Sequence, residues 1–222
     1  MWNEIKAFSK VNYTDWLVAL GAPAAVFLLL QLIIDGVMLA IRPDETIFMS
    51  CALLAMVAAV CCFAVSHGNF SINYPQLIRF GLTRKRAFGV VGGMTGLMLL
   101  GCAALSGALI LFERTLSMSI WRSLSGNPAL LVDDFGFVWW AVPLAALGGW
   151  LVGLFGAALV LRFGGKGQLF GFILYFGGLF GFQLLPWKTH EVTNILIPAL
   201  VLFAIAAVVW SVWTLLRLRI TK

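Results

Sequence analysis

Charged side chains are scarce in this chain. Of its 222 residues only 11% are charged, whereas 62% are hydrophobic. A soluble domain carries charge on about a quarter of its residues, because its surface has to stay in contact with water. The scarcity therefore excludes an ordinary soluble domain and indicates a surface that faces lipid.

Groups that carry out chemistry are equally rare. The chain has two histidines, His67 and His190, and neither lies beside a plausible serine or cysteine nucleophile within an apolar run. The glycine-rich segment 164–167 is not a phosphate loop, because Lys166 is followed by Gly167 where such a loop needs serine or threonine. We therefore predict that the protein is not an enzyme and has no catalytic, cofactor-binding or metal site of its own.

Cysteine is present, but not in a pattern that binds metal. The four cysteines all lie inside apolar runs and lack the spacing of metal ligands. They are Cys51, Cys61, Cys62 and Cys102. We interpret them as small, buried hydrophobic residues.

What the chain has instead is six long apolar runs. A helix crosses the bilayer core with about 20 mostly apolar residues, because lipid offers no partner for a backbone hydrogen bond. The runs are 17–41, 47–65, 87–112, 138–161, 168–186 and 195–216. They predict an all-α polytopic membrane protein with six transmembrane helices in a single transmembrane domain, residues 1–222. Within it, we expect residues 1–16 to form an interfacial segment, residues 17–216 the six-helix bundle, and residues 217–222 a cytoplasmic tail.

The distribution of basic residues predicts the orientation. Cytoplasmic segments of membrane proteins are enriched in lysine and arginine. With both termini in the cytoplasm, the inner segments contain most of the 15 basic residues, namely Lys6, Lys10, Arg79, Arg84, Lys85, Arg86, Arg162, Lys166, Arg217, Arg219 and Lys222. Only Arg42, Arg114, Arg122 and Lys188 then face outward. The net charge of +6 follows from this bias and requires no nucleic-acid partner.

Glycines recur at four-residue spacing in the later runs, as in Gly92 with Gly96 and Gly149 with Gly153. Small residues let two helix backbones approach closely, which supplies packing energy that hydrophobicity does not supply in lipid. The pattern predicts a compact bundle. It is compatible both with packing inside one chain and with a seam between two subunits.

One carboxylate, Asp35, lies well inside an apolar run, with Gln31 one helical turn before it. An ionised Asp at the centre of a spanning helix costs about 2.5 to 3.5 kcal/mol, unless a partner or a wet cavity receives it. Gln31 and Asp35 are therefore candidates for the lining of a translocation path. A structural hydrogen bond between helices is the alternative.

The connection between the second and third runs is the most informative polar segment. We expect Asn73 to cap a short helix that has Pro75 in its first turn, and Gly81 to end that helix. In such a helix Leu77 and Phe80 share one face. The connection thus predicts a short amphipathic helix with an aromatic tip.

Basic residues follow this helix directly. Thr83 is a suitable cap for the third span, and Arg84, Lys85 and Arg86 come next. Cations at a helix N-terminus oppose the macrodipole, so helix stability does not explain them. Attachment to anionic lipid headgroups is one explanation, and docking of the whole connection, residues 66–86, into a cytoplasmic partner is the other.

The segment YPQLIRFGLTRKRAF, residues 74–88, resembles the cytoplasmic turn of small permease subunits in bacterial ABC transporters of the ABC-2 type. In that family a short aromatic-rich helix is followed by glycine, an aliphatic residue, threonine or serine, arginine, a basic residue and an aromatic one. Six spans, cytoplasmic termini and a polar N-terminal segment with Trp2, Ile5 and Phe8 are also similar.

The resemblance implies a permease that moves an amphipathic or hydrophobic substrate, such as a peptide, lipid or drug, across a bacterial plasma membrane. A separate cytoplasmic ATPase dimer would bind ATP and Mg²⁺, and a second permease subunit, identical or paralogous, would complete the path among the membrane lipids. The residues implied to couple to the ATPase are Tyr74, Leu77, Ile78, Arg79, Phe80, Gly81, Thr83, Arg84, Lys85 and Arg86. From the residues alone, a self-contained carrier or channel and an accessory membrane subunit stay open as alternatives.

Overall fold

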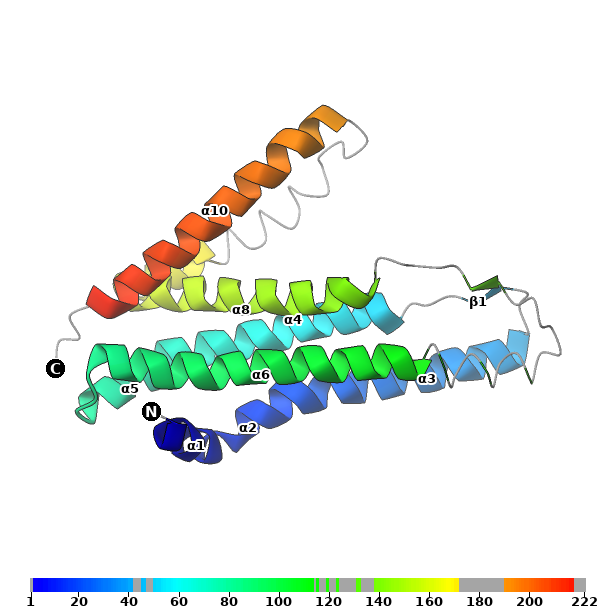
Figure 1. The fold of residues 1–222 in the computed structure, drawn as a ribbon, viewed down its shortest axis with the longest axis horizontal. Helices are drawn as coiled ribbons and strands as arrows, with labels where there is room; N and C mark the ends of the chain where they lie inside the picture. The colour runs from blue at the N-terminus through cyan, green and yellow to red at the C-terminus, as the bar shows by residue number, and fades with distance from the viewer. Residues whose placement is uncertain are drawn as a thin grey trace. The chain divides into compact units, whose positions relative to one another are not determined.

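The computed structural model is almost entirely helical in the part of the chain that it describes (Figure 1). The described residues are 2–41, 45–46, 50–113, 115, 119, 123, 131–132, 138–171 and 190–217. The exception is a minimal parallel pair of strands, β1 (Glu45–Thr46) and β2 (Leu131–Val132), in which Glu45 pairs with Leu131. The predicted all-α class is confirmed apart from this pair.

The helices follow one another in the order of the predicted runs, and two short π-helical segments, η1 and η2, continue α-helices without a break. The helical elements are α1 (Trp2–Val11), α2 (Tyr13–Trp16), η1 (Leu17–Gly21), α3 (Ala22–Ile41), α4 (Ser50–Gly68), η2 (Asn69–Asn73), α5 (Tyr74–Arg79), α6 (Arg84–Phe112), α8 (Val138–Phe163) and α10 (His190–Arg217).

Four helical stretches of the described residues are long and apolar enough to cross a membrane. They are Tyr13–Val37, Leu54–Arg79, Arg84–Phe112 and Ala141–Phe163. Each overlaps one of the first four predicted runs, so the prediction of a helical membrane protein is confirmed at this level. The second stretch differs in its bounds, because its helix continues beyond the predicted end at Val65 as far as Arg79. The apolar part of α10, Val201–Arg217, is shorter. Most of the fifth predicted run, 168–186, lies outside the described residues, and the count of six spans stays a prediction.

Two compact units make up the chain. We call one the acidic unit, which contains Trp2–Val65 and Gly93–Trp150, and the other the basic unit, which contains Ser66–Gly92 and Leu151–Lys222. Helices α4, α6 and α8 each contribute residues to both. The two names refer to the charged residues that each unit carries, as described below.

The core of the acidic unit is built from side chains of α3, α4, α6 and α8. Its buried members are Phe27, Leu54, Ala58, Cys62, Cys102, Ile110, Val142 and Ala146. Because lipid is as apolar as these side chains, close packing holds such helices together more than hydrophobic transfer does. Cys61, Cys62 and Cys102 are buried, as predicted.

Two glycines of this unit lie in close contacts between helices. A Cβ atom at Gly149 would collide with the backbone carbonyl group of Ala59 on α4. One at Gly93 of α6 would lie 2.7 Å from Cδ1 of Ile5 on α1. At these two positions the glycine pattern therefore serves packing within one chain, which is one of its two interpretations.

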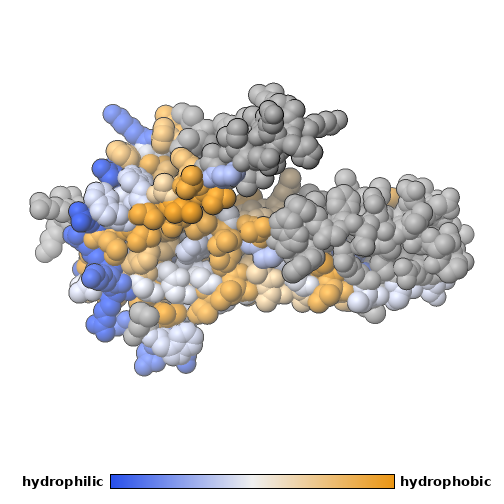
Figure 2. Space-filling model, turned by 45° about the horizontal axis from the view of Figure 1, so that its top comes forward, coloured by the Kyte–Doolittle hydropathy of each residue, from blue (hydrophilic) through white to orange (hydrophobic). Residues whose placement is uncertain are grey.

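Aromatic side chains pack against one another in the basic unit. Phe70 and Tyr74 are fully buried, and the ring centroid of Phe70 lies 5.6 Å from that of Phe88. On α8, the ring centroid of Phe155 lies 5.6 Å from that of Trp210 on α10. Apolar residues also cover much of the coloured surface in Figure 2, as expected of helices that face lipid.

Candidate coupling site

The segment that leads into the predicted coupling turn is a continuation of α4. The backbone is helical without interruption from Ser50 to Arg79, through η2 and α5. Pro75 lies in the first turn of α5, as predicted. The predicted cap at Asn73 is wrong: its backbone is helical (φ −74°, ψ −37°), and its side-chain amide donates to Oδ1 of Asn69 at 3.0 Å. Because the preceding turn already supplies carbonyl acceptors for the amides of α5, no side-chain cap is needed.

Gly81 ends α5, as predicted. Its φ angle is +96°, a region that residues with a Cβ atom rarely adopt. Three backbone hydrogen bonds close the turn: Phe80 N to Gln76 O at 2.9 Å, Gly81 N to Ile78 O at 3.0 Å, and Leu82 N to Leu77 O at 3.1 Å. A side chain at Gly81 would strain this turn.

The third span begins directly after this turn. Thr83 precedes the first residue of α6, and its carbonyl group accepts a hydrogen bond from Ala87 N at 2.8 Å. Thr83 therefore holds the cap position that the sequence predicts for it.

The predicted coupling residues differ widely in exposure. Phe80, at the tip of the turn, is 82% exposed, whereas Leu77 and Ile78 are half-buried. Tyr74 is fully buried. Arg84 is half-buried. The remaining basic and small residues are exposed, namely Arg79, Gly81, Thr83, Lys85 and Arg86. Phe80 alone therefore presents a large, fully accessible apolar surface among these residues.

Two side chains that flank the turn hold the carboxyl end of α10. The hydroxyl group of Tyr74 donates to the carbonyl oxygen of Leu215 at 2.6 Å, and Nη1 of Arg84 donates to that of Leu216 at 3.5 Å. The last carbonyl groups of a helix have no N–H partner within it, so these bonds satisfy acceptors that α10 leaves open. Sequence reasoning missed this contact, because its partners are 141 and 132 positions apart.

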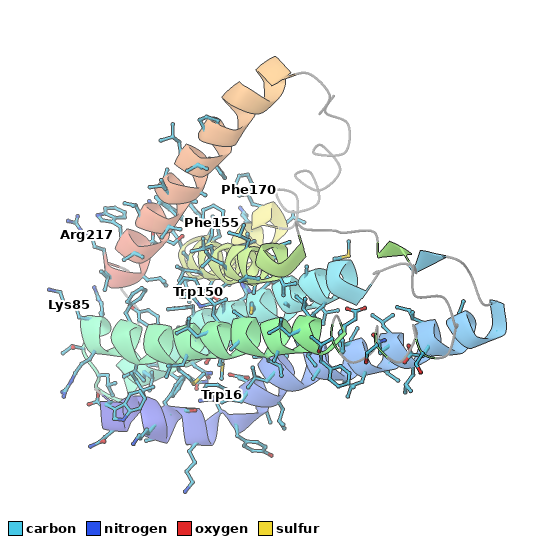
Figure 3. The ribbon with its side chains drawn as sticks, turned by 45° about the vertical axis from the view of Figure 1, so that its right-hand side comes forward. Trp16, Lys85, Trp150, Phe155, Phe170 and Arg217 are labelled. Atoms are coloured by element: carbon cyan, nitrogen blue, oxygen red, sulfur yellow. The ribbon has the colours of Figure 1, made fainter. Side chains whose placement is uncertain are left out.

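The same contact explains one of the three cations at the start of α6. The carboxyl end of a helix carries a partial negative charge, so the guanidinium group of Arg84 is stabilised there. Figure 3 shows Lys85 at the start of α6 and Arg217 at the end of α10, on the same side of the basic unit. Lys85 and Arg86 have exposed side chains at this end.

The predicted path residues lie in the acidic unit. Nε2 of Gln31 donates to Oδ1 of Asp35 at 3.1 Å, which confirms that both side chains share one face of α3. Gln31 is only 8% exposed, and Asp35 is half-buried. The bond lies within one helix, so an amide of α3 itself stabilises the carboxylate.

A third polar residue of this unit, Glu113, was missed from the sequence. It directly follows α6 and is only 4% exposed. Helices α3 and α6 run in the same direction (Figure 1). A Cβ atom at Gly101 of α6 would lie 3.3 Å from Cδ2 of Leu20, which precedes α3. From this contact, Leu32 lies about 18 Å further along the first helix, and Glu113 lies about 18 Å further along the second, at 1.5 Å per residue. Glu113 therefore lies at about the depth of Gln31 and Asp35, and its position at the end of an apolar run was the only signal in the sequence.

Comparison with protein-family models, with curated proteins and with solved structures finds no match for this chain. The chain is a helical protein with membrane-length apolar helices. Its functional interpretation therefore rests on its own residues and on the contacts described above.

Proposed function

We propose that this chain is the permease subunit of an ABC-2-type transporter and that residues 74–86 couple it to a separate cytoplasmic ATPase. One observation carries the proposal: Phe80 is 82% exposed at the tip of a turn whose flanking residues, Tyr74 and Arg84, bind the end of α10. A displacement of the turn is thereby transmitted to a second helix through two hydrogen bonds. A coupling element needs this combination of an exposed docking residue and a firm connection to the helices that move.

The proposal includes six helices that cross a bacterial plasma membrane, with both termini in the cytoplasm. ATP and Mg²⁺ bind to the ATPase dimer, and a second permease subunit, identical or paralogous, completes the path within the lipid. The substrate is amphipathic or hydrophobic, such as a peptide, lipid or drug. The scarcity of ionisable side chains in the apolar runs supports a substrate of this kind, because transport of ions or protons relies on such groups.

In this proposal the Gln31–Asp35 pair lines the translocation path. A hydrogen-bonded carboxylate at this depth can hold a polar group of an amphipathic substrate while the surrounding apolar side chains receive the rest. Closure of the ATPase dimer pushes on Phe80, and Tyr74 and Arg84 transfer the displacement to α10.

Phe80→Asp tests the coupling. If Phe80 fills a groove of the ATPase, the variant places a charge in a desolvated contact, and capture of the ATPase by the detergent-solubilised permease should fall by at least about tenfold. The ATPase to use is one that lacks membrane spans and is encoded beside this chain. Val11→Asp is the matched control, because Val11 is 79% exposed but lies at the end of α1. Undiminished capture by Phe80→Asp would remove residues 74–86 from the coupling role.

The orientation is tested by labelling single cysteines in a variant that lacks the four native ones. Cysteine at position 222 should react with an impermeant thiol reagent only after the cells are opened, and cysteine at position 125 should react in intact cells. Labelling of both positions in intact cells would contradict the six-span arrangement.

A self-contained carrier is the second candidate, because Glu113 is a second carboxyl group, buried in the unit that contains Asp35. Carriers place such groups near the middle of the membrane, where they bind the coupling ion. The purified chain in proteoliposomes, without any ATPase, distinguishes the two. Substrate accumulation driven by a proton or sodium gradient would favour the carrier.

A further inference from the structure

Two arginines from different helices converge on one tryptophan in the basic unit. The guanidinium carbon of Arg217 lies 5.0 Å from the ring centroid of Trp213, and that of Arg162 lies 6.0 Å from it. Arg162 also lies 5.5 Å from the ring centroids of Trp210 and Phe163. The aromatic rings attract both guanidinium groups and so bring together two positive charges that repel each other.

Each of these arginines occupies the last turn of its helix, Arg162 in α8 and Arg217 in α10. Both side chains are exposed. A guanidinium group that lies over an aromatic ring keeps its N–H edge available, and this edge matches two oxygens of a phosphate group. Two such groups around one ring form a surface that suits an anion of this geometry.

The basic unit contains almost no acid that neutralises this charge. Its sequence, residues 66–92 and 151–222, includes ten basic residues and a single acidic one, Glu191. Glu191 lies near the start of α10, about 39 Å from Arg217 along the helix axis at 1.5 Å per residue. Charges that far apart are screened from each other, since the Debye length is about 8 Å at physiological ionic strength. No acidic side chain of this unit therefore complements the two arginines.

An exposed apolar stripe on α10 leads to the same place. Leu202, Ile205, Val209 and Trp213 follow one another at helical spacing and are 67%, 55%, 63% and 46% exposed. Arg217 comes one turn after Trp213 on this face, and Figure 3 labels it at the end of the helix. A ligand that follows this face meets apolar surface first, then an indole ring, and finally two guanidinium groups. That order matches the acyl chain, the glycerol region and the phosphate of a phospholipid.

We propose that Arg162, Arg217 and Trp213 form a binding site for the phosphate headgroup of an anionic phospholipid, with its acyl chain along the α10 stripe. The assignment is independent of coupling to an ATPase. It distinguishes these residues from Arg84, whose guanidinium group is engaged with the end of α10.

The experiment titrates the full chain in detergent with dioleoyl phosphatidylglycerol or dioleoyl phosphatidylcholine and measures retained lipid by native mass spectrometry. We expect phosphatidylglycerol to bind about tenfold more tightly, because only its net negative headgroup complements both guanidinium groups. Arg162→Gln together with Arg217→Gln should abolish this preference. Lys6→Gln together with Lys10→Gln is the matched control, because it removes the same charge from α1, where Lys6 lies 5.3 Å from the Trp2 ring centroid. This control should retain the preference for phosphatidylglycerol.

Equal losses in the two double variants would overturn the site, because lipid retention would then depend only on net charge. Trp213→Leu is a second variant, which removes the indole ring without changing the charge. Unaltered lipid selectivity in this variant would overturn the role of the ring.

Inorganic phosphate and polyglutamate are added as competitors. Displacement of the lipid by millimolar phosphate would identify a free-phosphate site, and displacement by polyglutamate an acidic protein surface; either result would overturn the lipid assignment.

Discussion

The two compact units of this chain carry net charges of opposite sign. Eight of the nine acidic residues belong to the acidic unit, together with five basic ones, whereas the basic unit has ten basic residues and one acid. In the acidic unit, Gln31, Asp35 and Glu113 are buried or half-buried, and Gln31 donates a hydrogen bond to Asp35. In the basic unit, charged side chains lie mostly at exposed helix ends.

The difference shows two solutions to the cost of charge in an apolar protein. A charge between helices needs polar partners from its own chain, because neither lipid nor water is there to receive it. A charge at a helix end stays at the surface, where external anions and water stabilise it. In the acidic unit, Gln31 therefore supplies a partner to Asp35 within the protein, whereas the basic unit presents most of its described charges at the surface.

The largest effect is expected from a small change in the acidic unit. Gly149→Val should destabilise the protein by about 3 kcal/mol or more, because its Cβ atom collides with the backbone of Ala59. Gly148→Val is the matched control, since nothing lies within 4 Å of a Cβ atom at Gly148. The measurement is thermal unfolding in detergent micelles. Equal stability of the two variants would contradict the close contact of α4 with α8.

A smaller effect is expected in the basic unit from Tyr74→Phe. The variant keeps the buried ring and leaves the carbonyl oxygen of Leu215 without its donor, which should cost about 1 to 2 kcal/mol. Tyr13→Phe, at a position 62% exposed, should change stability by less than about 0.5 kcal/mol. In the proposed transporter, Tyr74→Phe should also lower substrate-stimulated ATP hydrolysis while ATPase capture persists. Hydrolysis at the wild-type level would show that the Tyr74 bond is only structural.

The smallest effect on stability is expected from Asp35→Asn, at less than about 1 kcal/mol. The Asn side chain still offers a carbonyl oxygen to Nε2 of Gln31, so the hydrogen bond survives while the charge is lost. Transport of a cationic amphipathic substrate should nevertheless decrease. Transport at the wild-type rate would assign the pair to helix packing, as the alternative interpretation of the sequence has it.

Most local sequence features were good predictors, because the interacting residues are close along the chain. The apolar runs, the end of α5 at Gly81 and the shared face of Gln31 and Asp35 all follow from spacing within one helix. The prediction that Asn73 caps a helix was wrong, although it also concerned neighbouring residues. An Asn that caps a helix after a loop can instead continue the helix when the preceding turn is already helical. The π-helical segments η1 and η2 had no recognised signal.

The sequence by itself determined that the helices are apolar enough to face lipid, and it determined where basic and acidic residues lie along the chain. These two properties depend only on composition and on the length of the apolar runs. A run of about 20 apolar residues is long enough for a helix to cross the bilayer core. Only the tertiary structure decided which residues meet. Tyr74 reaches Leu215, Gly149 meets Ala59, and Arg162 and Arg217 share Trp213, all between segments far apart in sequence. Such pairs depend on how the helices pack. Packing in lipid follows from the shapes of the helices and from polar groups that need a partner, and neither can be read from a local sequence pattern.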